Sequence, residues 1–175
     1  WRNLSKRGMN MENQAEIMAS RSVQRDFRKP IWRKFISAVR TYDLIQPGDR
    51  VAVCVSGGKD SLLLAVCMRE LAKYSDVPFQ VEYLSMDPGY APENRRKMIE
   101  NARKLGFDLN VFDSPIFEAV NSVNRGFCHV CASMRRGYLY REARKLGCNK
   151  IALGHHMDDA VETILLSMLY GGEYK

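Results

Sequence analysis

Short apolar stretches alternate along this chain with longer stretches of helical periodicity, and this alternation restricts the folds open to it. Strands are expected at Arg50–Ser56, Phe79–Met86, Asp108–Phe112 and Lys150–Leu153, and helices at Ser61–Tyr74, Pro92–Leu105, Met134–Leu146 and from Asp158 onward. Nearly continuous apolar strands that alternate with helices are typical of parallel sheets covered on both faces. We therefore expect an α/β fold with a doubly wound, Rossmann-like parallel sheet.

A basic N-terminal region precedes the alternating part. Residues 1–50 carry eleven Lys/Arg against five Asp/Glu, so this region has a net charge of +6 out of +7 for the whole chain. Residues 1–23 show no steady periodicity and are expected to form a flexible leader. Residues 24–48 are expected to contain a basic N-terminal helix that starts at Pro30, and residues 49–175 to form the main domain. Such a basic arm favours a phosphate-backbone partner, although a solvated face that aids solubility has the same composition.

Cysteine content and hydropathy indicate a cytoplasmic protein. No apolar run approaches the ~20 residues that a membrane-spanning helix needs, so no membrane partner is expected. The first residues lack the apolar segment of a secretory signal. The five cysteines, an odd number, argue against a disulfide framework and are expected to stay reduced.

The turn "SGGKDS", Ser56–Ser61, joins the first expected strand to the following helix. Gly57 and Gly58 permit a tight turn in which backbone N–H groups approach an anion at the helix N-terminus, and Lys59 adds a full positive charge. The spacing fits neither a Walker A loop nor the G-x-G-x-x-G dinucleotide fingerprint. An ordinary Gly-Gly turn is the alternative, but its polar neighbours favour a phosphate site.

The stretch "IALGHHMDDAVE" after the last strand brings further polar groups to the same edge of the sheet. Gly154 allows a close backbone approach, and His155 and His156 follow it at the strand end. Asp158 and Asp159 then crowd the helix start together with Glu162. These acids are either helix caps, with Asp159 and Glu162 as a box-like pair, or ligands for Mg²⁺.

Cys128 and Cys131 form a C-x-x-C pair directly before the expected helix at Met134–Leu146. The helix dipole, Arg135 and Arg136 favour their thiolate forms. Half a zinc site, a redox pair and part of an iron–sulfur cluster all fit such a pair, and no second C-x-x-C completes a zinc site. The remaining cysteines, Cys54, Cys67 and Cys148, are expected to be mainly structural.

The segments "VCVSGGKDS", "CHVCASMRRGYLY" and "GCNKIALGHHMDDAVETILLSMLYGG" together resemble the PP-loop ATP pyrophosphatases of the tRNA 2-thiocytidine synthetase type. The resemblance runs from about Arg25 to Lys175. It implies the adenine nucleotide alpha hydrolase fold and an ATP-dependent tRNA thiolation. The C2 oxygen of a tRNA cytidine attacks the α-phosphate of Mg-ATP, pyrophosphate leaves, and sulfur then displaces AMP.

The same resemblance implies residue roles and partners. The implied catalytic residues are Lys59, Asp60 and Asp158, with Asp60 and Asp159 holding Mg²⁺. The implied ATP contacts are Ser56, Gly57, Gly58, Lys59, Asp60, Ser61, Ser85, Met86, Asp87, Gly154 and His155. Cys128 and Cys131 match two of the three cysteines that hold a 4Fe-4S cluster in that family.

The third cysteine lies further along the family's chain, so we expect this sequence to be a piece of a longer protein without its C-terminal part. The implied partners are tRNA, a sulfur donor such as a cysteine desulfurase, and a second copy in a homodimer. Two alternatives remain open. One is another PP-loop tRNA-modifying enzyme, which forms 2-thiouridine or lysidine, and the other is a nucleotide-binding module without catalysis.

Overall fold

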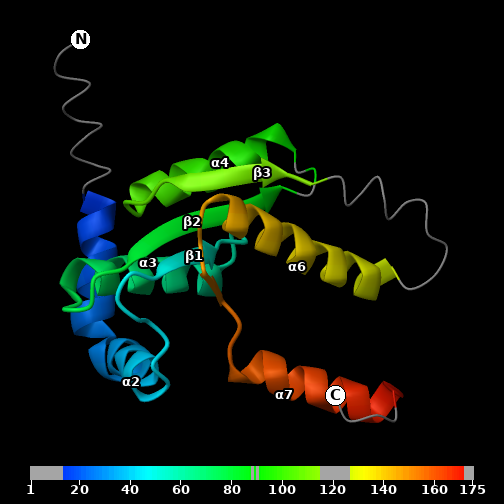
Figure 1. The fold of residues 1–175 in the computed structure, drawn as a ribbon, viewed down its shortest axis with the longest axis horizontal. Coiled ribbons are helices and arrows are strands. Elements are labelled where there is room, and N and C mark those ends of the chain that lie inside the picture. The colour runs from blue at the N-terminus through cyan, green and yellow to red at the C-terminus, as the bar shows by residue number, and fades with distance from the viewer. Residues whose placement is uncertain (1–13, 88, 90, 115–126, 172–175) are drawn as a thin grey trace.

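A computed structural model describes residues 14–87, 89, 91–114 and 127–171 of the chain (Figure 1). Residues 14–21 are helical, and two π-helical turns follow at Ser22–Asp26 and Arg28–Trp32. The strands are β1 (Arg50–Cys54), β2 (Gln80–Asp87), β3 (Leu109–Asp113) and β4 (Lys150–Leu153). The helices are α2 (Arg33–Thr41), α3 (Lys59–Tyr74), α4 (Pro92–Lys104), α6 (Phe127–Lys145) and α7 (Met157–Leu166), and a last π-helical turn spans Ser167–Gly171.

The four strands of the described residues form one parallel sheet in the order β3-β2-β1-β4. This arrangement confirms the expected doubly wound α/β fold. The chain winds outward from β1 to β3 and then returns to place β4 on the other side of β1, in register from Val51–Lys150 to Cys54–Leu153. Ligands of such sheets bind beyond the carboxyl ends of the strands where the order reverses, which here is the crevice between β1 and β4.

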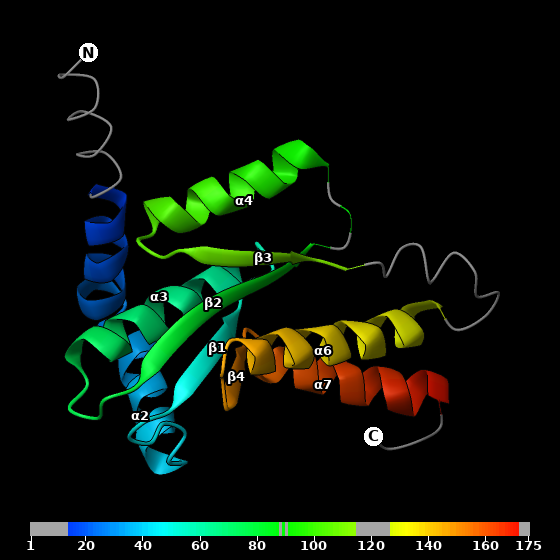
Figure 2. The same cartoon turned by 45° about the horizontal axis from the view of Figure 1, so that its top comes forward.

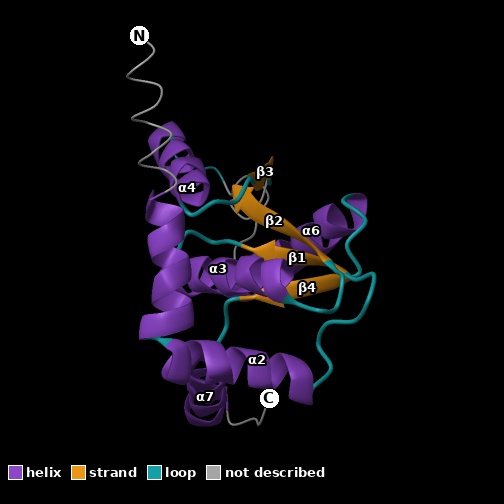
Figure 3. Cartoon of the chain, turned by 90° about the vertical axis from the view of Figure 1, so that its left-hand side faces the viewer, coloured by secondary structure: helices purple, strands orange, loops and turns teal. Residues whose placement is uncertain are grey.

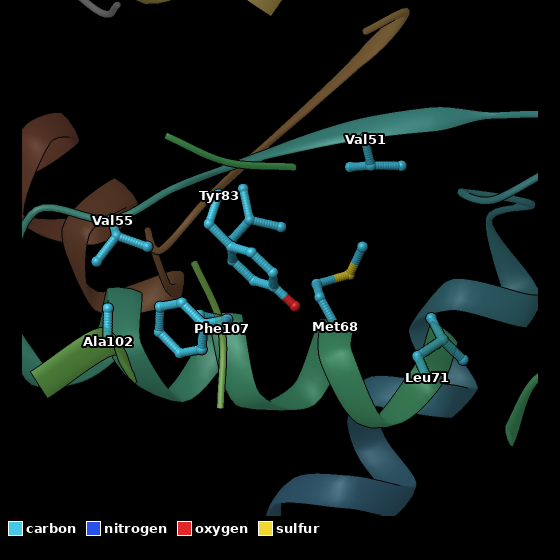
Figure 4. Packing of buried hydrophobic residues seen from close by; sticks show 9 residues of the cluster. Val51, Val55, Met68, Leu71, Tyr83, Ala102 and Phe107 are labelled. Atoms are coloured by element: carbon cyan, nitrogen blue, oxygen red, sulfur yellow. The ribbon is translucent and has the colours of Figure 1, made fainter. Parts of the chain in front are cut away.

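Helices cover both faces of the sheet, as Figure 3 shows with α3 and α4 on one side of the strands and α6 on the other. Alternate residues of β1 serve the two faces, because successive side chains of a strand point in opposite directions. Val51, Val53 and Val55 pack toward α3, where the rings of Tyr83 and Phe107 stack with centroids 4.4 Å apart (Figure 4). Ala52 packs toward α6 on the opposite face.

The segment at residues 14–23 differs from the expected flexible leader, because it is helical and anchored to α3. Val23 is buried against α3, and Ser20 Oγ and Gln24 Nε2 donate to the two carboxylate oxygens of Glu70 at 2.8 and 2.7 Å. Arg69 donates to the same carboxylate at 2.8 Å. Polar side chains hold this segment, so a search for apolar periodicity missed it. Residues 1–13 of the expected leader lie outside the described part.

Two helices lie near the carboxyl edge of the sheet, and the first of them differs from expectation at its start. Helix α6 begins at Phe127 rather than at Met134, so Cys128 and Cys131 lie inside the helix and not before it. Helix α7 begins at Met157 and extends away from the sheet (Figure 1), with large apolar side chains such as Leu165 and Leu166 about half exposed. None of the helices that the structure describes is long and apolar enough to cross a membrane.

Candidate nucleotide site

The loop between β1 and α3 is a closed turn that presents backbone N–H groups at a helix N-terminus. Gly57 has φ +84°, a conformation that residues with a Cβ atom rarely adopt. Ser61 is buried, and its hydroxyl accepts from the Ser56 N–H at 3.1 Å while donating to the Gly58 carbonyl at 2.9 Å. Ser61 therefore shapes the loop from within; Gly58 lines the cavity described below, whereas Gly57 lies on the side of the loop that faces α4.

Lys59 and Asp60 open α3 and pair with each other. The Lys59 ammonium donates to the two carboxylate oxygens of Asp60 at 2.9 and 2.8 Å. This hydrogen bond is the main cause that raises the pKa of Lys59 and lowers the pKa of Asp60, so both groups are charged at neutral pH. The Lys59 side chain is 85% exposed. It can therefore turn from the carboxylate to a phosphate group without disturbing any packed side chain.

Gly154, at the end of β4, brings that strand into direct contact with the loop. A Cβ atom at this position would lie 2.9 Å from the backbone N and Cα atoms of Ser61, closer than real Cβ contacts. Only glycine allows the chain after β4 to pass so near the start of α3. The close backbone approach expected of Gly154 is therefore found, and its partner is the loop itself.

The start of α7 gathers acids around His156. The backbone N–H of His156 donates to Asp159 at 2.7 Å, and the two residues form a capping box. The expected pairing of Asp159 with Glu162 is thus wrong, because His156 takes that place as the N-cap. The ring of His156 lies 3.5 Å from Asp159, 3.9 Å from Asp158 and 4.0 Å from Asp60. Asp158 is almost fully exposed.

These elements surround a cavity of about 740 Å³ at the carboxyl ends of β1 and β4, between α3, α6 and α7. Four of the expected ATP contacts in the loop line it, namely Ser56, Gly58, Asp60 and Ser61, together with Gly154, His155 and Asp159. The walls also include Arg135 and Arg136 of α6, to which sequence reasoning gave only a role in thiolate formation. The sequence signal that could have placed these arginines in the cavity is their position four and five residues after Cys131, on the same helix. The cavity joins an anion-binding loop, two arginines and carboxylates, which is the chemistry of a Mg-nucleotide site.

The three expected contacts at the end of β2 separate onto different faces. Met86 lines the cavity. Ser85 is buried on the other face, with its hydroxyl 3.3 Å from the sulfur of Met98 in α4. Asp87 is also buried, and its carboxylate accepts from the Gly89 N–H at 2.9 Å and lies 3.3 Å from the Arg95 guanidinium. The Asp87 carboxylate therefore closes the turn after β2, and only Met86 of the three reaches the cavity.

The cysteines fall into two groups. Cys128 and Cys131 lie one turn apart in the first part of α6, and their side chains lie outside the described part of the structure. Cys54 and Cys67 are buried, and that burial raises the pKa of each thiol to about 11. Such thiols are poor nucleophiles at neutral pH, which agrees with the structural role expected of them. Burial also raises the pKa of Cys148.

Comparison with known proteins supports the nucleotide site. A family model for the PP-loop domain matches residues 27–174. A tRNA-cytidine(32) 2-sulfurtransferase of Neisseria meningitidis serogroup A is 38% identical over 144 residues, which are 79% of this chain and 44% of the relative. The enzyme of that name from Sorangium cellulosum is 36% identical over 151 residues, 85% of this chain and 53% of the relative. The chain thus spans about half the length of these curated relatives.

Among solved structures, the U34-tRNA thiolase NcsA from Methanococcus maripaludis, with its 4Fe-4S cluster, superposes with a TM-score of 0.63. The two chains are 20% identical, and the match covers 81% of this chain and 52% of that one. This likeness shows that the fold is shared.

Proposed function

The chain belongs to the PP-loop domain family, and from this premise we propose that it carries the ATP-binding part of a tRNA thiolation enzyme. The C2 oxygen of a tRNA cytidine attacks the α-phosphate of Mg-ATP, the bond between the α and β phosphates breaks, and pyrophosphate leaves. Sulfur then displaces AMP from the activated base. The observation that supports this most directly is the single cavity that joins the loop at Ser56–Ser61 to Asp159 and the α6 arginines.

The loop is suited to hold the leaving pyrophosphate. Gly58 lines the cavity where the positive end of α3 begins, and the exposed Lys59 side chain stands at the same helix start. Charge grows on the pyrophosphate as the bond breaks, so donors fixed in advance stabilise the transition state more than the ground state. Arg135 and Arg136 add positive charge from the opposite wall.

The acids at the loop and at the start of α7 fit a magnesium ion. Mg²⁺ in nucleotide sites is held by one or two carboxylates together with phosphate oxygens and waters. Asp60 and Asp159 both line the cavity and both lie within 4.0 Å of the His156 ring. We assign the ion to these two residues; Asp158, which is almost fully exposed and does not line the cavity, stays a predicted catalytic residue without an assigned step.

Cys128 and Cys131 fit two ligands of an iron–sulfur cluster, because residues three apart lie on one face of a helix. Such a cluster, when bound, supplies sulfide for the second half of the reaction. The helix that carries the cysteines also carries Arg135, so the sulfur-handling and nucleotide-handling groups share one rigid element. A sulfur donor such as a cysteine desulfurase, a homodimer and a cytoplasmic location remain predictions.

The test uses the complete natural protein, prepared without oxygen and supplied with ATP labelled at the α-phosphate. We expect AMP and pyrophosphate to form when tRNA is added. Lys59→Ala is expected to lower the rate on the order of 100-fold, the usual effect of removing one group that stabilises transition-state charge. Lys104→Ala, which removes an exposed lysine of α4, is the matched control and should keep the wild-type rate.

Nucleoside mass spectrometry of tRNA from cells that lack the gene identifies the product. Loss of 2-thiocytidine supports the proposal, whereas loss of a thiouridine or of lysidine assigns the chain to another tRNA-modifying branch. ATP binding without any AMP formation would overturn the enzymatic reading and leave a nucleotide-binding module.

A further inference from the structure

A second charged surface lies on the N-terminal helical segment, apart from the nucleotide cavity. Seven Lys/Arg side chains between residues 21 and 40 are exposed, namely Arg21, Arg25, Arg28, Lys29, Arg33, Lys34 and Arg40, and Asp26 is the one acid in that range. None of the seven forms an ion pair within the described part of the chain. Elsewhere, cations such as Arg50, Lys73 and Lys150 pair with carboxylates at 4.0 Å or less.

Part of this surface is a groove of about 720 Å³ along α2 and the π-helical turn before it, Arg28–Trp32. Lys29, Arg33, Ser37 and Thr41 follow one another at intervals of four residues, and Lys34 and Tyr42 lie on the neighbouring row. Residues four apart on a helix share one face, so cations and hydroxyls line the groove as a continuous row. Tyr42, at the end of the groove, is 72% exposed.

The groove belongs to a rigid part of the molecule. Phe35 and Val39, on the opposite side of α2, pack against the main core. The preceding helix is fixed through Ser20 and Gln24 to the buried carboxylate of Glu70. Leu44, just after α2, accepts from the Lys150 ammonium at 2.8 Å. These contacts hold α2 beside the amino end of β1 (Figure 2), whereas the nucleotide cavity lies at the carboxyl ends of β1 and β4.

We propose that this groove binds the sugar–phosphate backbone of the tRNA substrate, with Tyr42 stacking on a base or ribose. The inference rests on the proposed function. Unpaired cations and hydroxyls match phosphate oxygens, and an exposed aromatic ring matches an unstacked base. The groove and the cavity lie at opposite ends of the strands, so a substrate that contacts both must be extended, as a folded RNA is.

The experiment measures binding of bulk tRNA to the whole protein at several salt concentrations. The variant Lys29→Ala/Arg33→Ala/Lys34→Ala removes three charges from the groove. The control Arg103→Ala/Lys104→Ala/Arg144→Ala removes three exposed cations of α4 and α6 that likewise form no ion pair in the described residues. Urea unfolding checks that both variants fold.

We expect the groove variant to bind tRNA on the order of tenfold more weakly and to reduce the salt dependence of log K by about 2, because released counterions scale with phosphate contacts. Tyr42→Ala should weaken binding on the order of fivefold, and Tyr42→Phe should restore it. Wild-type affinity in the groove variant, or equal losses in the groove and control variants, would overturn the proposal. AMP formation by the wild-type protein tests the proposed function separately, so the tRNA groove and the proposed function can be refuted independently of each other.

Discussion

Replacing Glu70 with glutamine should destabilise the protein strongly, because it removes the buried carboxylate that pairs with Arg69 and leaves the guanidinium only a longer contact to Glu16 at 3.7 Å. Glu70 is 1% and Arg69 7% exposed, and the Arg69 Nη2 and Nε atoms donate to the same Glu70 oxygen at 2.8 and 3.0 Å. Ser20 and Gln24 also donate to the carboxylate, and the Lys73 ammonium lies 4.0 Å from it. Glutamine keeps the shape of the side chain, so no cavity contributes to the change. The effect therefore comes from the lost charge and from one lost acceptor, because the amide NH2 group cannot accept a hydrogen bond as the carboxylate oxygen it replaces does.

The expected loss is about 3–5 kcal/mol in the free energy of unfolding, the usual cost of removing one partner of a buried ion pair. Glu100→Gln is the matched control. Its ion pair with Arg96, at 3.7 Å, is exposed on both sides, so the expected loss is under about 1 kcal/mol. Both values come from urea unfolding monitored by fluorescence, with the slope of the transition as a check on the two-state assumption.

The same substitution should release the N-terminal helix from α3. Trypsin should then cleave the Glu70→Gln protein after Arg21 or Arg25 faster than it cleaves the wild type under native conditions, because these sites lie in the anchored segment. A Glu70→Gln protein that loses less than about 1 kcal/mol and keeps its protection from trypsin would show that this cluster does not anchor the segment.

Three further predictions concern other parts of the molecule. Gly154→Ala should abolish ATP binding in calorimetry and lower the urea midpoint, because the added Cβ atom would lie 2.9 Å from the backbone at the start of α3. Unchanged ATP affinity would contradict this close contact between β4 and α3. The pKa of Asp49 is lowered from 3.8 to about 2, chiefly by its hydrogen bond with Lys150. Its stabilising effect is therefore complete above about pH 4 and is lost as the pH falls toward 2. In the Asp49→Asn variant the urea midpoint should depend less on pH over that range, and an equally steep pH dependence would refute the assignment. Iodoacetamide at pH 8 should spare Cys54 and Cys67 in the native protein, as peptide mass spectrometry can check, and their rapid alkylation would refute their burial.

The sheet and the tight turn at Ser56–Ser61 could be predicted because both depend on local patterns. Apolar runs around Val51–Val55 and Tyr83–Leu84 predict buried strands whatever else the chain does, and Gly57 marks a turn that few other residues can make. The close contact of Gly154 also followed from its residue type at a strand end.

Other features depend on partners distant in the chain and could not be predicted. The helix at residues 14–21 is held by polar contacts to Glu70, 50 residues away from Ser20, and such contacts leave no apolar period. Ser85 and Asp87 are polar residues at the carboxyl end of β2, where ligands of such sheets bind. Successive side chains of a strand point to opposite faces, however, so these two point away from the cavity that Met86 lines. His156 is the N-cap of α7 because Asp159 folds back onto its N–H, a pairing that sequence alone does not separate from Asp159 with Glu162.

Helix α3 connects two places that the proposals assign to different parts of one substrate complex. Its first residue, Lys59, belongs to the phosphate loop, and Glu70, eleven residues later, holds the segment that carries the basic groove. A helix rises 1.5 Å per residue, so about 16 Å of rigid rod separates the two attachments. The helix then acts as a spacer of fixed length between RNA backbone and nucleotide. The base that is modified would then depend on its distance from the RNA phosphates held in the groove, so a tRNA could be selected by its shape as well as by its sequence.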